Sequence, residues 1–210
     1  MHALVITADQ RASRRGADLV DATLAQLAAG PPALRPFERT AGDELQGVLD
    51  DPAHLAPVAE VLLRAGTWWV GIGLGPVETP LPTHARAGRG EAYVRARAAV
   101  SSAKSSPRPV RVVGPDAVDP GGTLTACLAL ETALWLWAGL LERRSARGWE
   151  VADLLRHGSS HAEAARHLGI SQSAVSQRAQ AANLAEAQRA EGLVTHLTTL
   201  AMHPGAGTPT

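Results

Sequence analysis

Short apolar runs alternate with segments of helical periodicity along the first half of the chain. Each run is short and rich in β-forming residues, which predicts buried strands. Each intervening segment has apolar residues at helical spacing and ends near glycine, proline or a basic residue, which predicts helices. The strands are expected at residues 3–7, 67–75 and 109–114, and the helices at 16–30, 53–66 and 89–104.

Two further apolar segments, 33–41 and 44–49, flank Gly42 and Asp43 and predict a hairpin, with Pro36 indicating an edge strand or a bulge. The predicted order is therefore βαββαβ followed by αβ. This order is typical of an α+β, ferredoxin-like palm that carries one extra unit.

Alternate glycines mark the strand at 67–75. Gly71, Gly73 and Gly75 have no side chains, so another backbone or a ligand can approach this strand closely. The stretch has the look of a phosphate loop, but it lacks the lysine and hydroxyl that follow a true one. We therefore interpret the glycines as a site of close packing.

A break in composition predicts a second, all-helical domain. Residues 116–123 read "DAVDPGGT", and the Pro-Gly-Gly within them is expected to end one element before the next helix begins. The predicted organisation is an α+β domain at 1–116, a linker at 117–123, a helical region at 124–203 and a disordered tail at 204–210. Within the helical region, the apolar stretch 126–141 is too short to span a bilayer comfortably, so it predicts a core or dimer helix.

Composition narrows the class of protein. The chain of 210 residues is 45% hydrophobic, which suffices for a core, and its formal net charge is zero. Any binding to nucleic acid must therefore be local rather than a property of the whole molecule. The only cysteine, Cys127, has no internal partner, and the N-terminus lacks the pattern of a secretory signal. We expect a cytoplasmic protein with no membrane contact.

Residues 161–180, "HAEAARHLGISQSAVSQRAQ", have the pattern of a helix-turn-helix. Ala165 is small where two helices must cross, Gly169 allows the turn, and Ser171 is a natural N-cap for the second helix. The motif resembles that of region four of sigma factors and of many repressors. The expected contacts to double-stranded DNA are base contacts from Gln172, Ser173, Ser176 and Gln177, and a phosphate contact from Arg178.

Two other interpretations of this motif remain open: an ordinary pair of amphipathic helices, and a module that binds protein. Charge also argues against tight binding by one copy, because the chain from Leu141 onward has seven arginines and six acidic residues. We therefore expect a homodimer. The contact between copies is expected from the helix with Trp135 and Trp137, or from the segment after Asn183.

Four motifs in the first half resemble the SatD family: "VITADQRASRR", "RTAGDELQGVL", "GIGLGPV" and "GRGEAYVRARAAVSSAK". The same motifs are similar to the catalytic palm of nucleotidyl cyclases and GGDEF-type enzymes. That second resemblance implies that Asp9, at the end of the first strand, and Asp43, in the hairpin, hold Mg²⁺ or Mn²⁺ on a nucleotide. Hard oxygen ligands suit either cation. The nucleotide itself is expected to contact Arg11, Glu44, Arg97 and Lys104.

The hairpin also departs from the active enzymes, because it lacks their doubled glycine and their phenylalanine. This departure favours a pocket that senses a ligand without converting it. The resulting hypothesis is a DNA-binding transcriptional regulator with a nucleotide- and metal-sensing domain. The alternatives are a metal-dependent nucleotidyl cyclase or transferase with an accessory DNA-binding module, and a purely structural hairpin.

Overall fold

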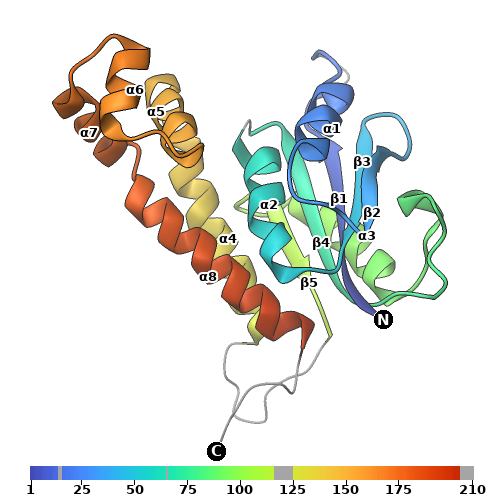
Figure 1. Cartoon of the computed structure of the whole chain (residues 1–210). Helices are drawn as coiled ribbons and strands as arrows, with labels where there is room; N and C mark the ends of the chain where they lie inside the picture. Colours follow the sequence, from blue (N-terminus) through green and yellow to red (C-terminus); the bar gives the residue numbers. More distant parts are fainter. Residues whose placement is uncertain (14–15, 65, 116–124, 204–210) are drawn as a thin grey trace, which may run out of the picture.

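The computed structural model describes residues 1–13, 16–64, 66–115 and 125–203, which form an α+β fold (Figure 1). Within these ranges there are a five-stranded mixed sheet and eight α-helices. The elements of the first half are β1 His2–Gln10, α1 Val20–Ala28, β2 Arg35–Arg39, β3 Glu44–Leu49, α2 Leu55–Arg64, β4 Trp68–Pro76, α3 Glu91–Ala103 and β5 Val110–Val113. The second half contains α4 Ala126–Glu142, α5 Ala146–Arg156, α6 His161–Leu168, α7 Gln172–Ala181 and α8 Leu184–Met202.

The predicted order of strands and helices in the first half is confirmed. The strands lie in the order β2-β3-β1-β4-β5, with β1 antiparallel to both β3 and β4 and with β5 parallel to β4. The register between β2 and β3 shifts between Arg35 and Glu38. Pro36 lies in this interval, and β2 is at the edge of the sheet, so the expected edge strand is confirmed and its pairing is irregular around Pro36.

The two faces of the sheet are covered by different helices. On one face, Leu4, Ile6 and Ile72 belong to the main hydrophobic core, which includes residues of α1, α2, α4 and α8. On the other face, Ala3 and Val5 pack with α3 in a smaller cluster. Successive residues of β1 thus serve opposite faces, as the period of a strand requires.

Helix α3 lies against the glycines of β4. A Cβ atom on Gly71 would lie 2.2 Å from the backbone nitrogen of Val100, and one on Gly73 would lie 2.1 Å from the carbonyl oxygen of Ala92. Any side chain at these positions would clash with the helix backbone. The prediction of close packing at these glycines is therefore confirmed.

The helical second half is divided between two cores. Helices α4 and α8 lie side by side and contact α2 (Figure 1), and Leu134, Trp137 and Val194 belong to the main core. Helices α5, α6 and α7 surround a separate small cluster that includes Val151, Ala165 and Val175. The expected linker at 117–123 and the expected tail at 204–210 lie outside the described residues.

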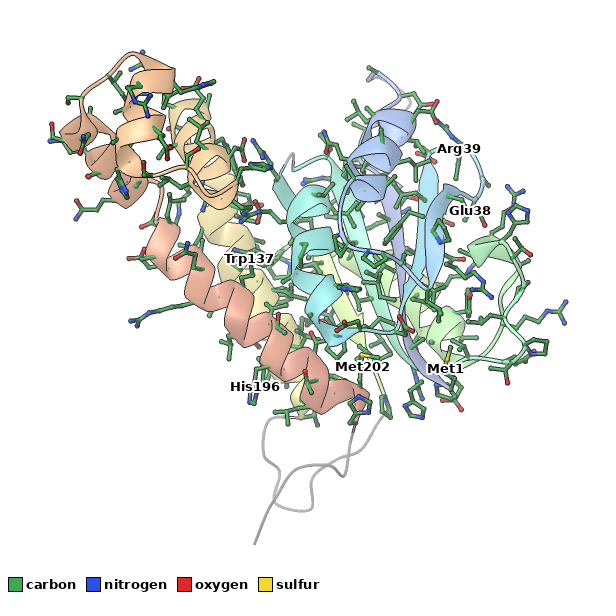
Figure 2. All side chains as sticks on the ribbon, viewed as in Figure 1. Met1, Glu38, Arg39, Trp137, His196 and Met202 are labelled. Atoms are coloured by element: carbon green, nitrogen blue, oxygen red, sulfur yellow. The ribbon has the colours of Figure 1, made fainter. Side chains whose placement is uncertain are left out.

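The tryptophans of α4 face the chain's own core. Trp137, labelled in Figure 2, is 1% exposed, and the indole nitrogen of Trp135 donates to the carbonyl oxygen of Val110 at 2.8 Å. A contact between copies through α4 would therefore have to use its exposed Leu128 and Leu136 rather than the tryptophans. No helix in the described ranges is long and apolar enough to cross a membrane.

Candidate ligand cleft and nucleic-acid interface

Asp9 and Asp43, far apart in the sequence, line the same cleft of about 950 Å³ at one end of the sheet. Asp9 lies near the end of β1, and Asp43 lies in the turn between β2 and β3. The backbone N–H of Gln10 donates to the carbonyl oxygen of Asp43 at 3.1 Å, which fixes the turn beside the strand. Because β1 pairs directly with β3, the hairpin tip and the end of β1 meet at one edge.

Lys104 provides a cation on the same cleft. It follows the last residue of α3, and its Nζ lies 2.9 Å from Oδ2 of Asp9. The side chain of Asp9 is 22% exposed and that of Lys104 is 50% exposed, so solvent screens this pair only in part. Three of the residues expected from the sequence, Asp9, Asp43 and Lys104, are thus brought together.

Arg39 of β2 is a cleft residue that the sequence analysis missed (Figure 2). Its guanidinium donates to Asp18 at 2.9 Å, to Asp21 at 3.0 Å and to the carbonyl oxygen of Gly42 at 2.6 Å. The hydrogen bond from Arg39 lowers the pKa of Asp18 below its ordinary value. The guanidinium therefore ties the hairpin tip to the start of α1, a long-range relationship without a local sequence signal.

Arg11 lies beside the cleft through an aromatic contact. Its guanidinium stacks over the ring of Trp69 at 4.2 Å, and its Nη1 donates to the carbonyl oxygen of Gly66 at 3.0 Å. Trp69 lies opposite Asp9 in the β1–β4 register and lines the cleft. A flat aromatic surface thus borders the two carboxylates, which sequence analysis missed because pairing of β1 with β4 creates it.

Two of the expected nucleotide contacts lie away from this cleft. The carboxylate of Glu44 accepts a hydrogen bond from the Thr40 hydroxyl at 2.6 Å, and Glu44 does not line the cleft. Arg97 is exposed on α3 and does not line it either. Glu44 stabilises its own hairpin, because Thr40 also donates its backbone N–H to the carbonyl oxygen of Glu44 at 3.0 Å.

The donor set of the cleft fits a cation that arrives with phosphate oxygens. Within the described ranges, no group of three or more His, Cys, Asp or Glu side chains gathers at one point. Mg²⁺ is commonly held by one or two carboxylates, with water and substrate phosphates completing its shell. Asp9 and Asp43 each supply a carboxylate to the cleft, and a protein cage for a metal alone is not formed by the described residues.

The helix-turn-helix has the local geometry that its sequence predicts. Ser160 and Glu163 form a capping box at the start of α6, Gly169 has φ +64° at its end, and the Ser171 hydroxyl accepts from the N–H of Ala174 at the start of α7. The left-handed conformation at Gly169 ends α6 and turns the chain into α7. Both ends of α6 and the start of α7 therefore each have an identifiable residue that sets them.

Helix α7 is exposed along most of its length. Val175 is its only buried residue, while Gln172, Ser173, Ser176 and Gln177 are exposed. The Ser173 hydroxyl lies 2.9 Å from that of Ser171, and the Ser176 hydroxyl donates to the carbonyl oxygen of Gln172. The amide groups of Gln172 and Gln177 have no hydrogen-bond partner among the described residues, so both are available for a ligand.

Arg178 differs from its neighbours on α7. Its Nη1 lies 3.8 Å from Oε2 of Glu150 on α5, and its side chain is 27% exposed. A phosphate contact would have to compete with this ion pair. Arg166 and His167 on α6, which the sequence analysis did not single out, are exposed near the turn and offer other cationic contacts.

A group of charged and aromatic side chains joins the helix-turn-helix unit (α5, α6 and α7) to the sheet unit (β1–β5 with α1, α2 and α3). Arg64 of α2 pairs with Asp153 of α5 and stacks on the ring of Trp149 at 4.0 Å. Glu60 of α2, 4% exposed, pairs with Arg156 of α5.

Comparisons of the chain with protein-family models, with curated proteins and with solved structures found no match.

Proposed function

We propose that the protein is a DNA-binding transcriptional regulator that reads double-stranded DNA with α7. The observation that carries this proposal is the exposed, polar surface of α7, which follows a turn formed by Gly169 and the N-cap Ser171. Val175 anchors the helix to the small core, while Gln172 and Gln177 present unpartnered amides to solvent. A recognition helix needs a buried face that packs on the domain core and an exposed face whose side chains can hydrogen-bond to bases.

The chemistry of these side chains suits the major groove. A glutamine amide donates and accepts at once, which matches the N6 and N7 edge of adenine, and serine hydroxyls serve as either partner. Gln172, Ser173, Ser176 and Gln177 are the proposed base contacts. Arg178, released from Glu150, and Arg166 are the proposed phosphate contacts.

The active form in this proposal is a homodimer in the cytoplasm. A single helix-turn-helix with so little net positive charge gains little from phosphate contacts, and a dimer doubles the contacts over two half-sites. Exposed leucines on the outer sides of α4 and α8 support an interface there. These leucines are Leu128, Leu136, Leu193 and Leu200.

The sheet unit is proposed to sense a nucleotide with Mg²⁺ or Mn²⁺. The order β2-β3-β1-β4, with antiparallel neighbours throughout, supports a ferredoxin-like palm of the SatD type. Asp9 and Asp43 would hold the cation, which neutralises phosphate charge. Lys104 would exchange its contact with Asp9 for a phosphate, and a base would take the place of Arg11 on the ring of Trp69.

The alternative function, a metal-dependent nucleotidyl cyclase or transferase, draws on the same cleft. The meeting of Asp9, Asp43 and Lys104 favours it, because two carboxylates and a cation are the groups that such a reaction requires. Incubation with each nucleoside triphosphate and Mn²⁺ tests it directly. If the wild type releases pyrophosphate and the Asp43→Asn variant does not, the cleft converts its nucleotide, and the enzyme function replaces the sensing function.

The test of DNA recognition starts from fragments of genomic DNA captured by the full-length chain. The affinity for a captured fragment and for a scrambled fragment is then measured by fluorescence anisotropy. Gln177→Ala is expected to weaken specific binding about 5- to 100-fold, as loss of one bidentate base contact does. The matched control is Gln26→Ala on the exposed surface of α1, which leaves binding unchanged. Equal affinity for captured and scrambled DNA would contradict the proposal.

A further inference from the structure

A pocket of about 580 Å³ lies where the helix-turn-helix unit meets α8. Its walls come from α5, α6, α7, α8 and the connection between α4 and α5, and it is separate from the cleft at the end of the sheet. The volume is within the range of small-molecule sites, and apolar side chains such as Ala152, Leu155 and Leu184 line part of it. The remaining lining includes two arginines, Arg144 and Arg156.

Arg144 is a buried cation without a matching anion. The residue is 6% exposed, its Nε donates to the carbonyl oxygen of Ala182 at 3.1 Å, and its guanidinium stacks on Trp149 at 4.2 Å. Its Nη2 has no hydrogen-bond partner among the described residues. Burial lowers the pKa of Arg144, which reflects the cost of holding its charge away from water. Stacking on an aromatic ring offsets that cost only in part.

The other charges of the pocket are balanced differently. Arg156 pairs with the buried carboxylate of Glu60 and lies 3.8 Å from Glu191. Glu186 and His161 also line the pocket, and both are exposed to solvent. Arg144 is therefore the lining cation whose charge no ion pair with a described residue compensates, and a bound anion would supply the missing acceptor.

We infer that this pocket binds a small organic carboxylate, with the carboxylate accepting from Arg144 and an apolar body resting against Ala152, Leu155 and Leu184. An apolar body is required because a bare inorganic anion would leave these side chains in contact with water. The recognised chemistry is thus an oxyanion attached to a hydrocarbon or aromatic group.

The position of Arg144 gives binding a regulatory consequence. Through Ala182, which caps the end of α7, Arg144 connects the recognition helix to the pocket. A carboxylate on Arg144 would fix the angle between α7 and α8, and so the separation of two recognition helices in a dimer. This consequence rests on the proposed DNA binding, whereas carboxylate binding itself does not.

Thermal denaturation of the full-length chain tests carboxylate binding, with sodium benzoate as the probe at constant ionic strength. Benzoate is expected to raise Tm to a plateau, because a ligand that binds only the folded state stabilises it by mass action. Acetate and inorganic phosphate distinguish the roles of the apolar body and of the charge, and both are expected to act more weakly. Neutral benzamide, which has the ring without the charge, is expected to leave Tm unchanged.

Variants locate the effect. Arg144→Gln is expected to weaken the response to benzoate at least about tenfold in concentration, and Arg143→Gln, an exposed neighbour, is expected to retain it. If Arg144→Gln does not fold, Gln188→Trp fills the pocket from an exposed position of α8 and should abolish the response. An equal rise in Tm for the wild type and Gln188→Trp, or no rise with benzoate, would overturn the inference. A larger rise with phosphate than with benzoate would overturn its requirement for an apolar body.

Discussion

Arg64 and Asp153 join the two units of the chain through a bidentate ion pair. Nη1 of Arg64 lies 2.8 Å from Oδ1 of Asp153, and Nη2 lies 2.7 Å from Oδ2. Arg64 ends α2, which packs beneath the sheet, and Asp153 belongs to α5 of the helix-turn-helix unit. The same guanidinium stacks on Trp149. These contacts connect α2 of the sheet unit to α5, a helix that precedes α7.

This ion pair predicts a measurable coupling energy. In a double-mutant cycle of Arg64→Gln and Asp153→Asn, the interaction is expected to contribute about 0.5–1 kcal/mol to the free energy of unfolding, because both side chains are 40% exposed and screened by solvent. Urea denaturation at low and high salt measures it, and the coupling should shrink at high salt. A coupling of zero at low salt would mean that the pair does not hold the units together.

The close packing of α3 on Gly71 predicts that one added methyl group at this position strongly lowers the stability of the fold. Gly71→Ala is expected to lower the free energy of unfolding by about 3 kcal/mol, because the new Cβ would meet backbone atoms of α3 that cannot move independently. Gly192→Ala is the control on α8, where nothing lies within 4 Å of the added Cβ, and it should raise stability by roughly 0.5–1 kcal/mol. Similar stability of the two variants in urea would contradict the close packing of α3 on β4.

The capping box of α6 predicts a dependence of stability on pH. Hydrogen bonds from Ser160 lower the pKa of Glu163 below its ordinary value of 4.5. Its contribution to stability is therefore present above pH 4.5 and is lost as pH falls through the lowered folded-state pKa. Glu163→Gln should lose stability at neutral pH and show a smaller further loss in acid.

The control for the capping box is Glu186→Gln, an exposed acid in the first turn of α8 that forms no such box. It should follow the wild-type pH profile measured by urea denaturation. A Glu163→Gln profile parallel to the wild type between pH about 5 and about 3 would show that the box does not respond to protonation.

The cleft predicts opposite effects of one substitution on two ligands. Lys104→Met removes the partner of Asp9, so Mn²⁺ alone should bind more tightly, while a nucleotide with Mn²⁺ should bind more weakly because a phosphate contact is lost. Asp9→Asn and Asp43→Asn should weaken both. Isothermal titration measures each affinity, with Asp50→Asn as an exposed control outside the cleft. Parallel changes for the two ligands in Lys104→Met would contradict the proposed exchange of partners.

Local patterns in the sequence predicted those parts of the structure that depend on neighbours along the chain. The hairpin around Gly42, the N-cap at Ser171 and the turn at Gly169 each follow from one or two residues with narrow backbone preferences. The close approach at Gly71 was also predictable, since alternate glycines in a strand leave one face without side chains.

Relationships between distant segments were not predictable in this way. Arg39 reaches Asp18 only because β2 lies beside the start of α1, and Arg64 reaches Asp153 only because the fold brings α5 within side-chain reach of α2. Glu44 lies opposite Asp9 in the sheet, yet its carboxylate bonds to Thr40 within the hairpin and does not line the cleft. These contacts depend on tertiary packing, which short sequence motifs do not encode.

The central claim is that α7 reads DNA, and its most direct test is the ratio of affinities for a captured genomic fragment and a scrambled fragment at fixed salt. The full-length wild type should prefer the captured fragment strongly, and the double variant Gln172→Ala and Gln177→Ala should lose most of that preference while retaining its weak affinity for scrambled DNA. Such a result would assign sequence reading to these two amides. A double variant that keeps the wild-type ratio would show that α7 does not read the sequence, and would contradict the account.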